Sequence, residues 1–142
     1  MSDPVGRRDD ARPLRLCYPA EPMELHRIRE DVRWWAELNE VPDAVLVDLQ
    51  LALGEAVANG VEHAYRTGDP GTVDVDLELR ISGSRGGVVA VRVADHGQWH
   101  QAPLMSGYRG RGLIMINYLA EQVAVSATRF GTEVYFEIPL RA

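Results

Sequence analysis

The strongest constraint on the fold is a pair of strand-like segments in the middle of the chain. Residues 72–82 (TVDVDLELRIS) alternate strictly between apolar and polar side chains, and residues 88–97 (VVAVRVADHG) form a second strand-like run. A period of two is typical of a strand with one face against a core. Because the turn-forming sequence SGSRGG joins the two runs, we expect an antiparallel hairpin within a larger sheet.

Six further segments have the pattern of regular elements, either an apolar period near 3.6 or alternation. The expected elements are strand 14–20, a helix from Pro22 that ends before Pro42, a helix from Pro42 or Asp43 through Tyr65, helix 110–122, and strands 123–128 and 132–140. The order is β-α-α-β-β-α-β-β. It predicts an α+β fold, a two-layer α/β sandwich with helices on one face of a mostly antiparallel sheet.

Composition and charge bound the class of protein. The chain has 142 residues, 46% of them hydrophobic, which suits one compact domain. We expect a flexible N-terminal tail at residues 1–12 and a single domain at 13–142. The net charge of -6 argues against direct nucleic-acid binding, because phosphate backbones are held by a basic face. A protein partner or a small ligand fits this charge better.

Lysine is absent and cysteine occurs once. All 15 basic residues are arginine, which excludes mechanisms that need a lysine amine, such as a Walker A phosphate loop or a pyridoxal Schiff base. Cys17 alone allows neither an intrachain disulfide nor a cysteine metal cluster. On the sequence pattern we expect no apolar run long enough to span a membrane, and therefore a cytoplasmic protein without membrane contact.

The expected second helix carries polar residues within a mostly apolar sequence, LALGEAVANGVEHAY at residues 51–65. Glu55 and Asn59 are four residues apart, so they project from one helix face, with Glu62 close by. Burial of such groups requires hydrogen-bond partners. Taken alone, the pair fits a solvated stripe on an amphipathic helix equally well.

Two other signals lie at strand ends. Asp95 follows an apolar strand and precedes Gly97, and such a strand end is a usual place for a ligand-orienting carboxylate. By itself, Asp95 also fits a turn residue that bonds its own loop backbone. Gly131 and Thr132 open the last strand, and alone they indicate only a turn.

A glycine-rich stretch, GYRGRGL at residues 107–113, lies immediately before the expected helix 110–122 or within its start. Glycines let backbone N–H groups approach a phosphate, and a helix N-terminus adds favourable partial charge. Arg109 and Arg111 add formal positive charge. The alternative is a flexible loop with a glycine cap. The surroundings are not a βαβ unit, so this is not the dinucleotide fingerprint.

The order of these signals resembles a known superfamily. The order is similar to that of the GHKL ATP-binding fold: Glu-x-x-x-Asn on a helix, Asp-x-Gly after a hairpin strand, Gly-x-Gly-Leu before a helix, and then Gly-Thr. That superfamily includes gyrase, a heat-shock chaperone, histidine kinases and mismatch-repair ATPases. Within it, LALGEAVANGVEHAY and RGRGLIMINYLAEQV are most similar to RsbW-type anti-sigma-factor serine kinases. The resemblance covers about residues 14 to 140.

The resemblance implies ATP and Mg²⁺ as ligands. Asn59 would bind Mg²⁺ through its side-chain oxygen, and Glu55 would be the catalytic general base. Asp95 would accept the adenine amino hydrogen, with Gly97 and Thr132 completing that pocket. The phosphates would be held by residues of the glycine-rich stretch, which are Arg109, Gly110, Arg111, Gly112 and Leu113. One departure from the family pattern is Trp99, which stands where the second glycine of Asp-x-Gly-x-Gly is found.

The resemblance also implies partners. An RsbW-type kinase phosphorylates a serine of a STAS-domain anti-anti-sigma protein, restrains a sigma factor and forms a homodimer. The alternative is a non-catalytic anti-sigma or adaptor module in which nucleotide only sets the conformation, and Trp99 keeps this reading open. A sensor histidine kinase fits less well, because the chain has no room for a dimerisation helix pair.

Overall fold

The computed structural model describes residues 13–67, 71–81, 86–96, 107–128 and 131–140. The side chains of 63–67, 107–112 and 128 are not described. The expected tail at residues 1–12 lies outside this part of the chain.

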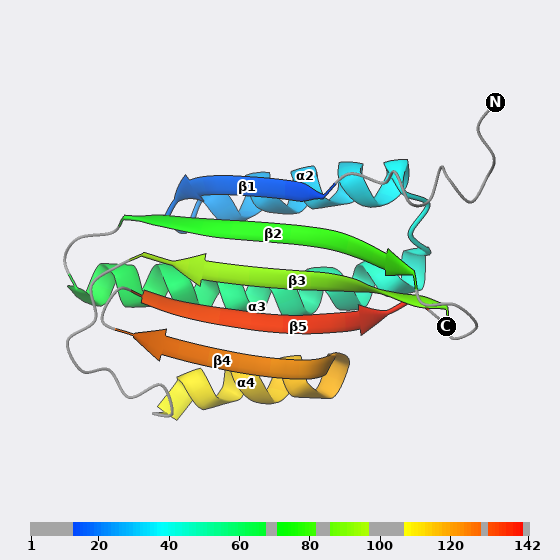
Figure 1. Cartoon of the computed structure of the whole chain (residues 1–142). Coiled ribbons are helices and arrows are strands. Elements are labelled where there is room, and N and C mark those ends of the chain that lie inside the picture. Colours follow the sequence, from blue (N-terminus) through cyan, green and yellow to red (C-terminus); the bar gives the residue numbers. More distant parts are fainter. Residues whose placement is uncertain (1–12, 68–70, 82–85, 97–106, 129–130, 141–142) are drawn as a thin grey trace.

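Five strands in the described residues form one sheet of order β1-β2-β3-β5-β4, and all neighbours pair antiparallel. The strands are β1 (Leu14–Pro19), β2 (Thr72–Ile81), β3 (Gly87–Asp95), β4 (Glu121–Thr128) and β5 (Gly131–Pro139). The helices are α2 (Glu24–Leu38), α3 (Asp43–Thr67) and α4 (Gly107–Leu119). All three lie on one face of the sheet (Figure 1). The expected α+β two-layer sandwich is therefore confirmed.

Alternation along β2 and β3 separates the two faces of the sheet. The strands pair antiparallel from Val73 with Asp95 to Ile81 with Gly87, which confirms the expected hairpin. On β2, Val75 is fully buried toward the helices. Its neighbours along the strand point to the opposite face, as the period of two requires.

Helix α3 is the core helix of the helical layer. Leu49 and Leu53 are fully buried and belong to one apolar cluster with Phe136 of the sheet. The 20-residue segment Asp43–Glu62 contains an 18-residue window with a mean hydropathy of 1.4, so by length and composition it could cross a membrane. The prediction that no run reaches that length is therefore wrong. Half of that window is buried inside the domain, as in a core helix.

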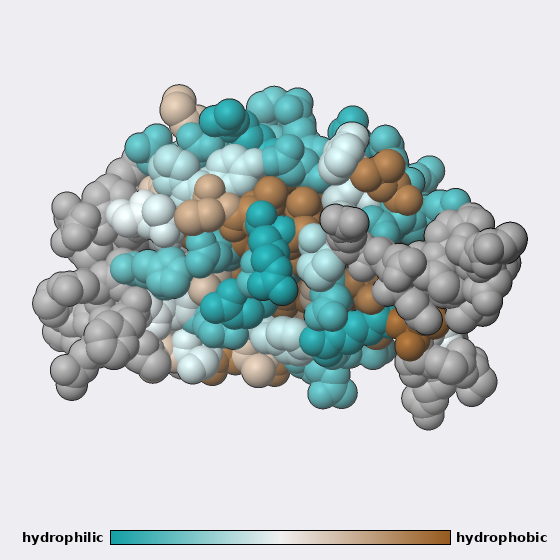
Figure 2. Space-filling model, turned by 45° about the horizontal axis from the view of Figure 1, so that its top comes forward, coloured by the Kyte–Doolittle hydropathy of each residue, from teal (hydrophilic) through white to brown (hydrophobic). Residues whose placement is uncertain are grey.

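The face of the sheet opposite the helices is polar. Arg92 donates hydrogen bonds to Asp76 at 2.7 Å and to Glu133 at 2.9 Å across the strands. Burial lowers the pKa of Arg92, but the hydrogen bonds and charges of the two carboxylates outweigh burial and leave this pKa above its ordinary value. Figure 2 shows hydrophilic side chains crossing this face, with hydrophobic ones between them. The pairs stabilise neighbouring strands without a helix to cover them.

The boundaries of α4 differ from the expected helix 110–122. The helix begins at Gly107, so the glycine-rich stretch forms its first turns instead of a preceding loop. It ends at Leu119, because Gln122 has a left-handed φ of 54° and Glu121 already pairs with Glu137 of β5. Glycine has a low helix propensity, which favoured a loop in the sequence, but its backbone adopts helical angles without steric hindrance.

Candidate functional site

A cavity of about 680 Å³ lies between α3 and α4, within the size range of small-molecule sites. Its lining residues are Glu55, Ala58, Asn59, Glu62, Ile114, Met115 and Tyr118. The helical spacing of Glu55 and Asn59 predicted a shared face, and the structure places both on one wall of this cavity. Glu62 extends the same wall, although the sequence reading gave it no role. The cavity therefore has one polar and one apolar wall.

Asp95 ends β3 and is buried, with 5% of its surface exposed. Its side chain points toward α3. A methyl group placed on Gly60 would lie 3.5 Å from Asp95 Cβ and 3.8 Å from Asp95 Oδ2. The absence of a side chain at Gly60 therefore leaves room beside the carboxylate. The sequence reading did not single out Gly60, because a small residue inside a helix carries no local signal of a distant contact.

Thr132 lies on β5 next to Asp95. The pairing of Ala94 with Glu133 brings the two residues level on neighbouring strands, and both are buried toward the helices. Among the described residues, none hydrogen-bonds the buried Thr132 hydroxyl oxygen. A buried hydroxyl without a hydrogen bond costs free energy, so this position suits a polar ligand atom or a water.

Gly131 holds the start of β5 close to the end of β3. Its φ is 142°, outside the range that other residues readily adopt, and an added Cβ would lie 1.9 Å from the Asp95 carbonyl oxygen. A side chain at this position would push the two strand ends apart. The sequence reading treated Gly131 as an ordinary turn residue. The Gly-Thr pair of the family pattern was the available signal for its role.

The two parts of the site meet on α3. Asn59 faces the cavity while the next residue, Gly60, faces Asp95. Consecutive helix residues project about 100° apart, which lets one helix serve both regions. The cavity wall with Glu55 and Asn59 and the buried carboxylate of Asp95 therefore lie against adjoining sides of α3.

The remaining candidate residues are less completely described. Gly97 and Trp99 lie outside the described residues. The backbone of Arg109, Gly110, Arg111 and Gly112 belongs to α4, but their side chains are not described. Leu113 is half-buried and packs against the core.

The donor groups of the cavity suit a hard cation that shares its ligands with a substrate. No group of three or more histidine, cysteine or acidic side chains able to hold a metal occurs in the part of the chain that was searched. Mg²⁺ does not need such a cage, because it commonly takes one or two protein oxygens together with phosphate oxygens and waters. The Asn59 amide oxygen, beside the Glu55 carboxylate, fits this requirement.

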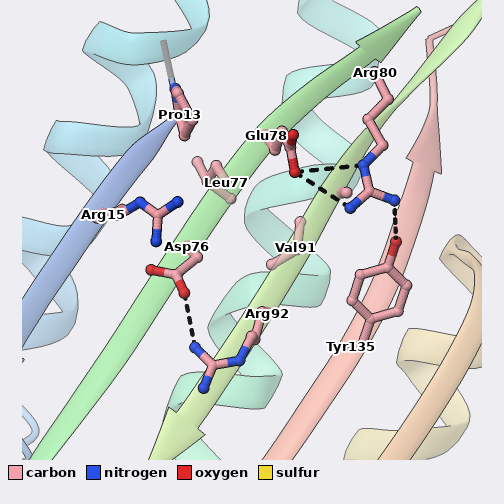
Figure 3. Close-up of a pocket in the computed structure, with 10 residues that line it drawn as sticks. Pro13, Arg15, Asp76, Leu77, Glu78, Arg80, Val91, Arg92 and Tyr135 are labelled. Atoms are coloured by element: carbon pink, nitrogen blue, oxygen red, sulfur yellow. Dashed lines mark hydrogen bonds and ion pairs between the residues drawn. The ribbon is translucent and has the colours of Figure 1, made fainter.

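A second, smaller cavity of about 160 Å³ lies on the open face of the sheet (Figure 3). Arg80 donates hydrogen bonds to Glu78 at 3.2 Å and to the Tyr135 hydroxyl at 3.1 Å. Burial raises the pKa of Tyr135, and so does its hydrogen bond to Glu137. These side chains bond one another, and none of the predicted site residues lines this cavity. The cavity between α3 and α4 is therefore the better candidate.

Comparison with known proteins identifies the family of this chain. Residues 18–138 match the family described as histidine kinase-like ATPase domain, so the chain belongs to that family. The chain also resembles the crystal structure of the RsbU and RsbW domains of Rv1364c from Mycobacterium tuberculosis. That likeness has a TM-score of 0.70 and 26% sequence identity over 90% of this chain, which spans 32% of the longer chain. Together these matches support a GHKL ATP-binding domain of the RsbW type.

Proposed function

We propose that this protein is a serine kinase that transfers the γ-phosphoryl group of ATP to a STAS-domain anti-anti-sigma protein. By this reaction it regulates a sigma factor through partner switching, as a cytoplasmic homodimer. The observation that carries the proposal is the position of Glu55 and Asn59 on one wall of a ligand-sized cavity. Membership of an ATPase family and likeness to an RsbW domain support it.

The adenine base is assigned to the buried end of β3. Asp95 accepts a hydrogen bond from the adenine amino group, and the Thr132 hydroxyl bonds the base directly or through a water. Guanine carries a carbonyl in place of that amino group, so a buried carboxylate disfavours it. Gly97 lets the base lie close to the backbone.

The phosphates are assigned to the start of α4. Gly110 lies in the first turn, where unpaired backbone N–H groups of a helix N-terminus attract anions, and Gly112, in the second turn, leaves room for the phosphates to approach. Leu113 anchors this turn against the core, and Arg109 and Arg111 add positive charge. Asn59 holds Mg²⁺, which when bound offsets the negative charge of the phosphates.

Glu55 is assigned the role of general base. The serine oxygen attacks the γ-phosphorus, a new oxygen–phosphorus bond forms, and the bond from that phosphorus to the β–γ bridging oxygen breaks. The serine proton passes to the Glu55 carboxylate, and ADP leaves with the electron pair of the broken bond. The products are ADP and a phosphoserine on the partner.

The test is phosphate transfer from radiolabelled ATP to purified STAS-domain proteins of the source organism, with and without Mg²⁺. The kinase proposal expects label on one serine of a STAS protein only when Mg²⁺ is present. Sigma-factor capture without any label would instead support the alternative, the non-catalytic anti-sigma module, which Trp99 in place of a family glycine leaves open. A Ser→Ala substrate that still became labelled would contradict the assigned acceptor.

A further inference from the structure

An apolar surface surrounds the cavity and continues beyond it along α3. We call it the α3–α4 patch, and it consists of Val47, Leu51, Ala58, Ile114, Met115 and Tyr118. The exposed fraction is 87% for Tyr118, 69% for Ile114 and 57% for Val47. Exposed apolar side chains grouped in this way are typical of interaction sites.

The α4 part of the patch is not explained by packing among the residues that the structure describes. Ile116 faces the core and is fully buried, whereas Ile114 and Tyr118 project from the opposite side of the helix. A helix that covers a sheet normally places polar residues on its outer side. Here the outer side is apolar, which indicates a partner for that side.

The α3 part of the patch reaches past the cavity. Val47, Leu51 and Ala58 share the outer face of α3, and only Ala58 of these three lines the cavity. At 1.5 Å per residue, the face from Val47 to Ala58 is about 17 Å long. Helix α4 runs antiparallel to α3, so its C-terminal end lies toward the N-terminal half of α3 (Figure 1). An occupant that contacts the whole patch is larger than the contents of the cavity alone.

We infer that the α3–α4 patch is the docking surface for the protein substrate of the proposed kinase reaction, and this inference rests on that proposed function. Glu55 lines the cavity beside the patch, so a segment seated on the patch brings its serine hydroxyl to the assigned base. Asp48, Glu55 and Glu62 give the same helix a row of negative charge. The substrate segment therefore carries apolar side chains and at least one lysine or arginine near its serine.

The experiment uses changes in the patch that lie outside the cavity. The double variant Val47→Gln and Leu51→Gln removes apolar surface from α3 and keeps residues that favour helix. The matched control is Leu38→Gln on α2, where Leu38 is 62% exposed and outside the patch. Calorimetry measures two affinities for each protein, one for ATP with Mg²⁺ and one for a purified STAS-domain protein whose acceptor serine is alanine.

We expect the double variant to bind the STAS-domain protein about tenfold more weakly or worse, with unchanged ATP affinity and an unaffected Leu38→Gln control. Equal STAS affinity in the double variant and the wild type would overturn the inference. A double variant that changed from dimer to monomer in sedimentation, with its STAS affinity unchanged, would also overturn the inference, because the patch would then contact a second copy of this chain.

A wild type that binds no STAS-domain protein also overturns it. Wild-type binding of unmutated STAS protein without phosphate transfer refutes the kinase proposal but leaves the docking result standing.

Discussion

Replacing Glu55 by Gln is expected to slow phosphate transfer to the STAS-domain protein by a factor of about 10² to 10⁴. Glutamine has nearly the same shape but cannot take the serine proton. The affinity for ATP with Mg²⁺ should remain close to that of the wild type, because Asn59 and Asp95 are unchanged. The measurement is single-turnover transfer of radiolabelled phosphate, with ATP affinity from calorimetry.

The matched control for this change is Glu62→Gln, a carboxylate on the same wall of the cavity. We expect the control to keep its rate at saturating substrate, since Glu62 has no assigned role in proton transfer. A Glu55→Gln protein that transferred phosphate at the wild-type rate would refute the base assignment. Equal losses of transfer rate in both variants would show that the negative charge of the cavity wall is required, and not proton transfer to Glu55.

Replacing Gly131 by Ala is expected to lower the free energy of unfolding by about 3 kcal/mol or more. The added Cβ would lie 1.9 Å from the carbonyl oxygen of Asp95, at a φ of 142° that alanine rarely adopts. Because both atoms belong to fixed strand ends, β3 and β5 must separate at this point. Chemical denaturation followed by circular dichroism measures the loss.

Gly86→Ala separates backbone strain from this steric clash. Gly86 also has a positive φ, 87°, but among the described residues no atom beyond its chain neighbours lies within 4 Å of its added Cβ. We expect this control to cost only about 1 kcal/mol. If the two variants had the same free energy of unfolding, the steric clash with Asp95 would not explain why position 131 requires glycine.

The central elements of the fold were predictable because their patterns are long and regular. Strict alternation predicted the β2–β3 hairpin, and the apolar period of residues 43–65 predicted a core helix. The boundaries of α4 were not predictable in the same way. Its glycine-rich start has little local preference for helix, and its end depends on the pairing of Glu121 with Glu137 in the sheet.

The candidate site shows the same division. The spacing of Glu55 and Asn59 is local, so the sequence predicted that they share a helix face. The contact between Gly60 and Asp95 depends on how α3 packs on β3, and no pattern within either segment encodes it. The outward apolar side of α4 was also hidden, because apolar residues all around a short helix look alike until the core is placed.

Calorimetric titration with ATP and Mg²⁺ tests the central claim most directly, on the wild type and on Asn59→Ala and Asp95→Asn variants, with GTP as a second ligand. The account predicts micromolar binding of ATP by the wild type, much weaker binding of GTP, and strongly reduced ATP binding in both variants. Each variant should unfold with a midpoint near that of the wild type. Absent wild-type binding, or ATP affinity unchanged in both folded variants, would contradict the assignment of this site to an adenine nucleotide.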